Sequence, residues 1–164
     1  MKSNPSLDLI DLTILDFLQA DSRITNVEIA RQINLSPPAV HTRIKRLEQD
    51  GYIRQYAALL DREMLGFDML CFIQVSLQVH QPEVVNHFRE CIAQIPQVLE
   101  CHHLTGDIDY LIKIVVRNQH DLQRFLMEQL TPIPGIARIH TSLALTEIKS
   151  TPSLPIHHNE DGLS

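Results

Sequence analysis

The sequence is poor in several features that mark whole classes of protein. Its 164 residues include three cysteines, without C-x-x-C spacing: Cys71, Cys91 and Cys101. This odd number argues against a disulfide framework, so we expect three reduced thiols in the core. No stretch approaches the roughly 20 apolar residues that span a bilayer, and no basic segment with a following apolar run opens the chain. These absences predict a cytoplasmic protein with no membrane partner.

An excess of positive charge is also missing. The formal net charge is −6, which argues against a protein that coats nucleic acid indiscriminately. The charge is uneven, because residues 1–60 hold seven basic and seven acidic side chains whereas residues 61–164 hold seven and thirteen. A basic surface in the first part can therefore still contact DNA locally. The apolar content of 44% is ample for a folded core.

Two short amphipathic segments joined by a tight turn occupy residues 25–53. Thr25 and Glu28 have the spacing of a capping box, which satisfies backbone N–H groups at a helix start. Four residues are predicted to form the buried face of this first helix: Val27, Ile29, Ala30 and Ile33. Asn34 and Leu35 make the turn. This layout predicts a helix-turn-helix DNA-binding motif.

The second helix of the motif has a well-specified start. Ser36 suits the N-cap, and Pro37 suits the first helical position, where its missing N–H costs no hydrogen bond. The helical period predicts that one face is buried, comprising Val40, Ile44 and Leu47. The exposed face is then polar and basic, with Thr42, Lys45 and Arg46 outward and His41 and Arg43 on the flanks.

A further helix is predicted ahead of the motif. Asp8 can cap a helix that ends between Ala20 and Ser22. Its apolar residues repeat at helical spacing and comprise Ile10, Ile14, Phe17 and Leu18. Together with the two helices of the motif, this helix is predicted to form a compact DNA-binding domain.

An extended segment is predicted after the motif. Gly51 suits the left-handed end of the second helix, and residues 52–60 have the composition of a strand, as in a wing or linker, with Arg54 exposed. Residues 61–69 show no clean periodicity and predict a linker. A DNA-binding domain is therefore expected over residues 1–60.

From residue 70 the pattern becomes strand, helix, strand, repeated once. The first strand is predicted from the alternation of Ile73, Val75, Leu77 and Val79. Pro82 starts a helix with a buried stripe of Val85, Phe88, Ile92 and Ile95. A second strand is predicted over residues 98–105, and a third from the alternation of Tyr110, Ile112, Ile114 and Val116.

The repeat closes with a helix and a fourth strand. Asn118 caps this helix, whose inward residues are predicted to be Leu122, Phe125, Leu126 and Leu130. The last strand is expected over residues 136–148, with one face formed by Ile139, Thr141, Leu143 and Leu145. The order βαββαβ predicts a ferredoxin-like sheet over residues 70–149. Because its helices cover one face only, the other face needs a partner, and dimerisation supplies one. The polar residues 150–164 are expected to form a tail that frays or crosses onto a neighbouring subunit.

Two strings in the sequence resemble the Lrp/AsnC family of leucine-responsive, "feast/famine" regulators. These are LSPPAVHTRIKRLEQDGYI, starting at Leu35, and HHLTGDIDYLIKI, starting at His102. The resemblance implies a cytoplasmic, nucleoid-associated α+β transcription regulator whose winged helix-turn-helix domain binds pseudo-palindromic operators. It also implies that the ferredoxin-like domain forms dimers, often octamers, and binds a small effector, usually an amino acid. No cofactor is expected.

The DNA-binding residues are predicted around the second helix of the motif. At its N-terminus, where family members approach the major groove, the candidates are Ser36, Pro38 and Ala39. Thr42, Arg43 and Arg46 follow, and His41, Lys45 and Arg54 are expected to contact the phosphate backbone. The arginines suit phosphates or a guanine edge, and the sequence does not separate these two kinds of contact. A solvated basic face is the alternative.

The effector site is expected at the element that matches the family's ligand loop, comprising Thr105, Gly106, Asp107, Asp109 and Tyr110. A glycine lets backbone N–H groups approach a carboxylate, and a nearby aspartate can take an ammonium. The alternative is a plain hairpin turn. On the last strand Thr141, Ser142 and Thr146 either line the same cleft from a neighbouring subunit or are ordinary strand residues.

A metal site is considered and set aside. Cys101, His102 and His103 offer donors, with His140, His157 and His158 as further candidates. Adjacent strand residues point to opposite faces, so His102 and His103 do not converge on one ion.

Two other functions compete with an effector-responsive regulator. A sirohaem-decarboxylase-like enzyme shares the architecture, but the intact basic helix and the lack of an arginine cluster in the second half count against it. No Ser-His-Asp or Cys-His motif indicates other catalysis, so we expect no enzyme. The third possibility is an architectural protein that bends DNA without an effector.

Overall fold

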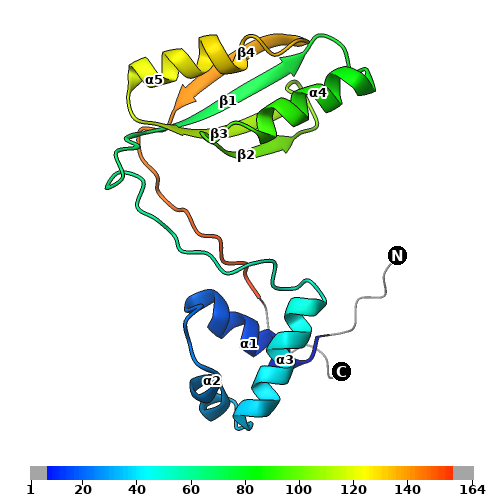
Figure 1. The fold of residues 1–164 in the computed structure, drawn as a ribbon, viewed down its shortest axis with the longest axis vertical. Helices are drawn as coiled ribbons and strands as arrows, with labels where there is room; N and C mark the ends of the chain where they lie inside the picture. The colour runs from blue at the N-terminus through cyan, green and yellow to red at the C-terminus, as the bar shows by residue number, and fades with distance from the viewer. Residues whose placement is uncertain (1–6, 157–164) are drawn as a thin grey trace. The chain divides into compact units, whose positions relative to one another are not determined.

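A computed structural model of the chain describes residues 7–156, and these form two compact units (Figure 1). The first unit comprises the described parts of residues 1–59 and 150–164, and the second comprises residues 60–149. The last described residues, 150–156, therefore belong to the first unit. Gln19 anchors them there, since its Oε1 accepts the N–H of Leu154 at 2.7 Å and its Nε2 donates to the Leu154 carbonyl at 3.2 Å.

Three helices make up the first unit: α1 (Leu9–Ala20), α2 (Asn26–Gln32) and α3 (Pro37–Gln49). Each begins at the residue that the sequence predicts, because Asp8 and Thr25 close capping boxes and the Ser36 hydroxyl accepts the N–H of Ala39. Their apolar faces meet in one core, which comprises Ile14, Ile29, Ala30, Val40, Ile44 and Leu47. The turn between α2 and α3 passes through Asn34 at φ 54°.

Two sequence predictions for this unit are wrong. Val27 is 45% exposed rather than buried, because two positions along an α-helix correspond to a rotation of roughly 200°, which places Val27 on the side opposite the buried Ile29. Residues 53–60 form no strand. They are extended, but a strand needs a hydrogen-bonded neighbour, and none of the described segments pairs with them.

The second unit is built on one four-stranded antiparallel sheet. Its strands are β1 (Met69–Leu77), β2 (Val98–His103), β3 (Tyr110–Val116) and β4 (Ile136–Leu143), in the order β2-β3-β1-β4. With α4 (Pro82–Ala93) and the helix after β3, this is the predicted βαββαβ arrangement. One face of the sheet packs on the helices through Cys71, Ile73, Val75, Tyr110, Ile112 and Ile114, which meet Phe88, Ile92, Phe125 and Leu130.

The helix after β3 changes its winding half-way. It runs as α5 (Gln119–Arg124), capped by Asn118 as predicted, and continues as a π-helix, η1 (Phe125–Leu130). The N–H of Thr131 donates to the carbonyl of Leu126, five residues back, at 2.9 Å. Both Phe125 and Leu130 are buried, so the wider turn keeps two residues five positions apart in one core.

Strand ends and one cysteine depart from the sequence predictions. β1 stops at Leu77 and β4 stops at Leu143, so Val79 and Leu145 lie outside the sheet and are exposed. The second strand ends at His103, before the turn. Of the three free cysteines only Cys71 is fully buried, whereas Cys101 is exposed because β2 is an edge strand. Among the described residues, no helix is long and apolar enough to cross a membrane.

Candidate DNA-binding and effector sites

The exposed face of α3 carries most of the predicted DNA-binding residues. Ser36, Pro38, His41, Thr42 and Lys45 are exposed, and Ala39 is half-buried. Two of the polar side chains also have internal partners. The Thr42 hydroxyl donates to the Pro38 carbonyl at 3.0 Å, and the His41 ring lies 3.4 Å from the amide of Asn26. The helix thus presents a polar surface with its first turn open to a ligand.

Two arginines of α3 form ion pairs with aspartates at the start of α1. Arg43 pairs at 2.7 Å with both Asp8 and Asp11, and Arg46 pairs with Asp11. The Asp11 side chain is 1% exposed, against 26% for Arg43 and 48% for Arg46. Hydrogen bonds to Asp8 and then to Asp11 raise the pKa of Arg43 above its ordinary value. A buried carboxylate that binds two arginines fixes α3 on α1, so this network orients the predicted recognition helix.

The pKa of the Asp8 carboxylate is shifted by the same contact with Arg43. Although its partial burial acts in the opposite direction, the N–H of Asp11 and the guanidinium of Arg43 hold its pKa below the ordinary value. Neither aspartate was assigned this role from the sequence. The signal available was weak, since Asp8 is the N-cap of α1 and Asp11 lies in its first turn, two positions where acidic residues are common for capping alone.

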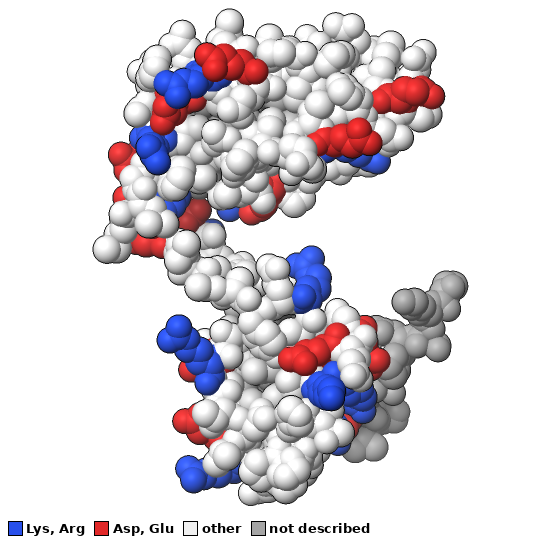
Figure 2. Space-filling model, viewed as in Figure 1, with Lys and Arg blue, Asp and Glu red and all other residues white. Residues whose placement is uncertain are grey.

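Lys45 and Arg54 differ from Arg43 and Arg46, which form ion pairs with α1. Both are exposed, and neither side chain has an ion-pair partner among residues 7–156. On the face of the first unit seen in Figure 2, blue and red side chains are interspersed and do not form a single basic patch. The first unit therefore offers DNA phosphates individual cations and no single basic patch on this face, and Lys45 and Arg54 are unpaired among the described residues.

The turn between β2 and β3 contains the predicted effector residues Thr105, Gly106 and Asp107, all exposed. Gly106 has φ +118°, in the region that favours glycine, and no atom beyond its own residue and its two chain neighbours lies within 4 Å of the position that a Cβ would take. The backbone is therefore accessible from solvent at this point. These three residues are contiguous and available to a ligand.

Asp109 has a different role from the other residues of the loop. Its Oδ2 accepts the N–H of Leu77 at 2.7 Å, and its Oδ1 lies 2.6 Å from Nε2 of His80. These contacts, led by the Leu77 N–H, hold the pKa of Asp109 below its ordinary value. The carboxylate thus joins the start of β3 to the end of β1. His80 was missed by the sequence analysis because a single histidine after a strand carries no motif.

The remaining predicted effector residues lie apart from the turn. Tyr110 is buried on the helix side of the sheet, next to Phe88. Thr141 is half-buried on β4, at the far edge of the sheet from β2, and Thr146 is exposed beyond the end of β4. Within one chain the structure brings together Thr105, Gly106 and Asp107, but not the threonines of the last strand.

The histidines considered as metal ligands do not converge among the described residues. His102 contacts Glu100 at 3.0 Å, whereas His103 stacks on Tyr110 with ring centroids 4.9 Å apart. No group of three or more metal-binding side chains is found in residues 7–156. His157 and His158 lie outside the described residues.

Comparison with known proteins accounts for both units. Residues 7–54 match the model of a winged helix-turn-helix DNA-binding domain, and residues 70–154 match the Lrp/AsnC ligand binding domain. The chain belongs to the Lrp/AsnC family of transcriptional regulators. It is 36% identical over 150 residues to the leucine-responsive regulatory proteins of Klebsiella pneumoniae and Escherichia coli K12, covering 92% of each chain.

Solved structures of Lrp/AsnC regulators have the same fold. A transcriptional regulator of Neisseria meningitidis in complex with L-Met superposes with a TM-score of 0.89 at 37% identity, covering 93% of this chain and 99% of that one. AsnC of Escherichia coli gives 0.79 at 26% identity, covering 89% and 97%. The chain is therefore a DNA-binding transcriptional regulator with a ligand-binding domain, and the family is not one of enzymes. The sirohaem-decarboxylase alternative is set aside on this ground.

Proposed function

We propose that this Lrp/AsnC regulator senses an amino acid at the turn formed by Thr105, Gly106 and Asp107. The observation that carries the proposal is the open backbone at Gly106 beside an exposed carboxylate. N–H groups in such a turn suit the ligand's carboxylate, and Asp107 suits its ammonium, since Asp109 is engaged by Leu77 and His80. The complex of the Neisseria regulator with L-Met supports an amino acid as ligand.

The regulator acts as a dimer or a larger assembly of dimers in this proposal. The face of the sheet away from the helices carries Phe72, which lies opposite Lys113 on β3 and Ser142 on β4. A second copy of the chain would cover this face. A symmetric pair of α3 helices then reads a pseudo-palindromic operator, with half-sites about one duplex turn apart. Thr141 and Thr146 would reach an effector only across such an assembly.

Thermal-shift measurements with the twenty amino acids test the sensing function. A ligand that binds only the folded protein raises the melting temperature, by an amount that grows with concentration above the dissociation constant. We expect a shift for a small subset of amino acids, lost in Asp107→Asn and kept in Asp68→Asn, an exposed aspartate of the same unit. The absence of any shift would contradict amino-acid sensing and favour an effector-independent architectural regulator.

Replacing Lys45 by alanine tests the proposed DNA surface. If Lys45 neutralises one phosphate, the slope of log K against log[salt] falls by about 0.9, and affinity falls similarly for all sequences. Binding isotherms over a salt series measure this slope. Lys149→Ala, which removes an exposed lysine outside α3, is the matched control and should leave the slope unchanged. An unaltered slope in Lys45→Ala would show that this lysine stays solvated in the complex.

A further inference from the structure

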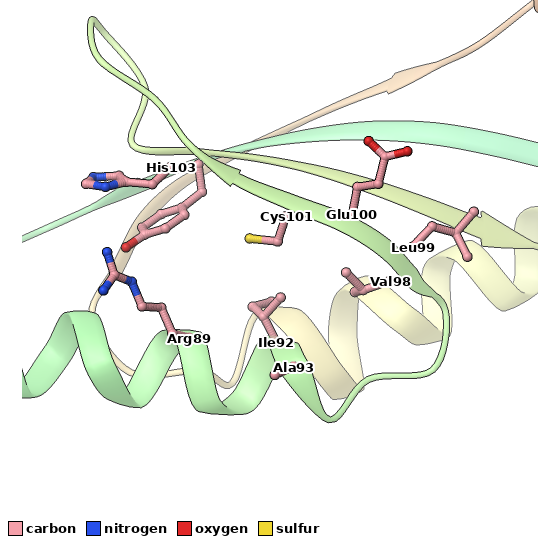
Figure 3. A pocket seen from close by; sticks show the side chains of 9 residues that line it. Arg89, Ile92, Ala93, Val98, Leu99, Glu100, Cys101 and His103 are labelled. Carbon is pink, nitrogen blue, oxygen red and sulfur yellow. The ribbon is translucent and has the colours of Figure 1, made fainter. Parts of the chain in front are cut away.

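A second candidate ligand site lies between α4 and the edge strand β2. The cavity there (Figure 3) has a volume of about 390 Å³, and its lining does not include Thr105, Gly106 or Asp107 of the exposed turn. Arg89 and Ile92 enter it from α4, and Cys101 and His103 enter it from β2. This volume accommodates a small metabolite.

The polar end of this cavity contains a hydroxyl without a partner. Tyr110 lines the cavity and is 2% exposed, and its hydroxyl oxygen makes no hydrogen bond among the described residues. The ring is held by Phe88 and His103, with centroids 4.5 and 4.9 Å away. Leaving a buried hydroxyl unbonded is unfavourable, and native structures rarely do so without a reason. A ligand acceptor at this end of the cavity would supply the missing bond.

Arg89 brings a positive charge to the same end. Figure 3 shows its side chain extending from α4 toward the strand end that carries His103. Within residues 7–156 its guanidinium has no ion-pair partner. A guanidinium presents two parallel N–H groups that match a carboxylate. Arg89 and Tyr110 together therefore suit an anionic head group.

The rest of the cavity is apolar and lacks a free carboxylate. Ile92, Val98 and Leu99 line the end away from Arg89 (Figure 3). Glu100 borders the cavity, but its carboxylate is turned away and is bound by His102 at 3.0 Å and Lys113 at 3.1 Å. No carboxylate of the lining is thus free to pair with a ligand's ammonium, and the Arg89 guanidinium would repel that charge. The cavity favours a carboxylate that carries an aliphatic chain and no charged amine.

We propose that this cavity binds a short branched aliphatic 2-oxo acid, with Arg89 and Tyr110 holding its carboxylate and oxo oxygens. Such acids are the products of removing the amino group from aliphatic amino acids. The regulator would then respond to the oxo acid at this site and to the amino acid at the turn. Binding of the oxo acid does not require the proposed amino-acid sensing. Only the regulatory role of the oxo acid rests on that proposed function.

Isothermal titration of the full-length protein with 4-methyl-2-oxopentanoate tests the proposal. L-Leucine is the matched ligand, with the same carbon skeleton and an ammonium in place of the oxo group. Arg89→Gln should weaken oxo-acid binding by about 10- to 100-fold, the usual effect of losing a hydrogen bond to a charged group. Arg124→Gln removes an exposed arginine elsewhere in the same unit, and Asp107→Asn alters the turn. Both should retain oxo-acid binding.

Tyr110→Phe separates a binding role from a packing role. The phenyl ring preserves the contacts with Phe88 and His103 but removes the unbonded hydroxyl. The free variant should melt at the same temperature as the wild type or about 2 to 4 °C higher, while its affinity for the oxo acid falls about tenfold. A merely structural tyrosine would give lower stability and unchanged affinity.

Three results would overturn the proposal. The first is that the wild type does not bind the oxo acid, and the second is that Arg89→Gln binds the oxo acid as tightly as the wild type does. The third is that leucine binds more tightly than the oxo acid and that this binding depends on Arg89. If leucine binding is lost in Asp107→Asn and kept in Arg89→Gln, the amino-acid site at the turn is supported whatever the result for the oxo acid. The experiment therefore tests the two sites independently.

Discussion

Replacing Asp11 by asparagine is expected to lower the melting temperature of the first unit by roughly 10 °C. The substitution preserves the size of the side chain but removes the charge that Arg43 and Arg46 share. Loss of one partner from a buried pair costs about 3 to 5 kcal/mol, and the partial exposure of both arginines reduces this to about 2 kcal/mol. In a unit of this size, each kcal/mol corresponds to about 4 to 8 °C.

Differential scanning calorimetry of the full-length protein measures this change as a shift of one transition. Asp50→Asn removes the same charge from an exposed position at the end of α3 and should leave the melting temperature nearly unchanged. If both variants melted alike, the contacts of Asp11 with the arginines would contribute nothing to stability. DNA binding of the Asp11 variant, measured well below its melting temperature, would then show whether the arginines released from Asp11 contact DNA.

Replacing Gly135 by alanine is expected to destabilise the second unit by about 3 kcal/mol. Gly135 precedes β4 with φ +89°, and a Cβ built there lies 2.3 Å from Cγ1 of Val84 on α4. The left-handed backbone costs an L-residue about 1 to 2 kcal/mol, and forcing a methyl group against Val84 adds about 1 to 3 kcal/mol. Denaturant unfolding followed by circular dichroism measures the difference.

Two control variants divide this cost into its parts. Gly106→Ala meets the same backbone restriction with no atom near the new Cβ, so it should lose only about 1 to 2 kcal/mol. Val84→Ala removes the clashing methyl groups, and combined with Gly135→Ala it should recover the steric part of the loss. A double variant no more stable than Gly135→Ala alone would show that backbone strain accounts for the whole effect.

The sequence predicted the helix starts correctly because each depends on residues close together. Asp8, Thr25, Ser36 and Asn118 are caps whose partners lie three residues away, and all four cap a helix in the structure. The order of strands and helices was also predictable, since each core strand has a period of two. Residues 52–60 show the limit of this reasoning. Their composition favours a strand, but strand formation requires a neighbour that local sequence does not specify.

The site residues were harder to predict because their partners are distant in the chain. Arg43 and Arg46 lie on the polar side of α3, and no feature of that helix shows that Asp11, more than thirty residues earlier, binds both. Tyr110 was expected both in the core and in the effector loop. Its ring lies in the core and its hydroxyl borders the cavity under α4, a location that only the packing of α4 against β2 determines.

The π-helix between Phe125 and Leu130 has a consequence for the natural variation of this family. Its wider turn accommodates one residue more than a regular α-helix needs to place both side chains in the same core. A homologue one residue shorter at this point can keep an equivalent core by winding as an ordinary α-helix. Deletion of a single residue should therefore be tolerated here, inside a helix, where deletions are normally excluded.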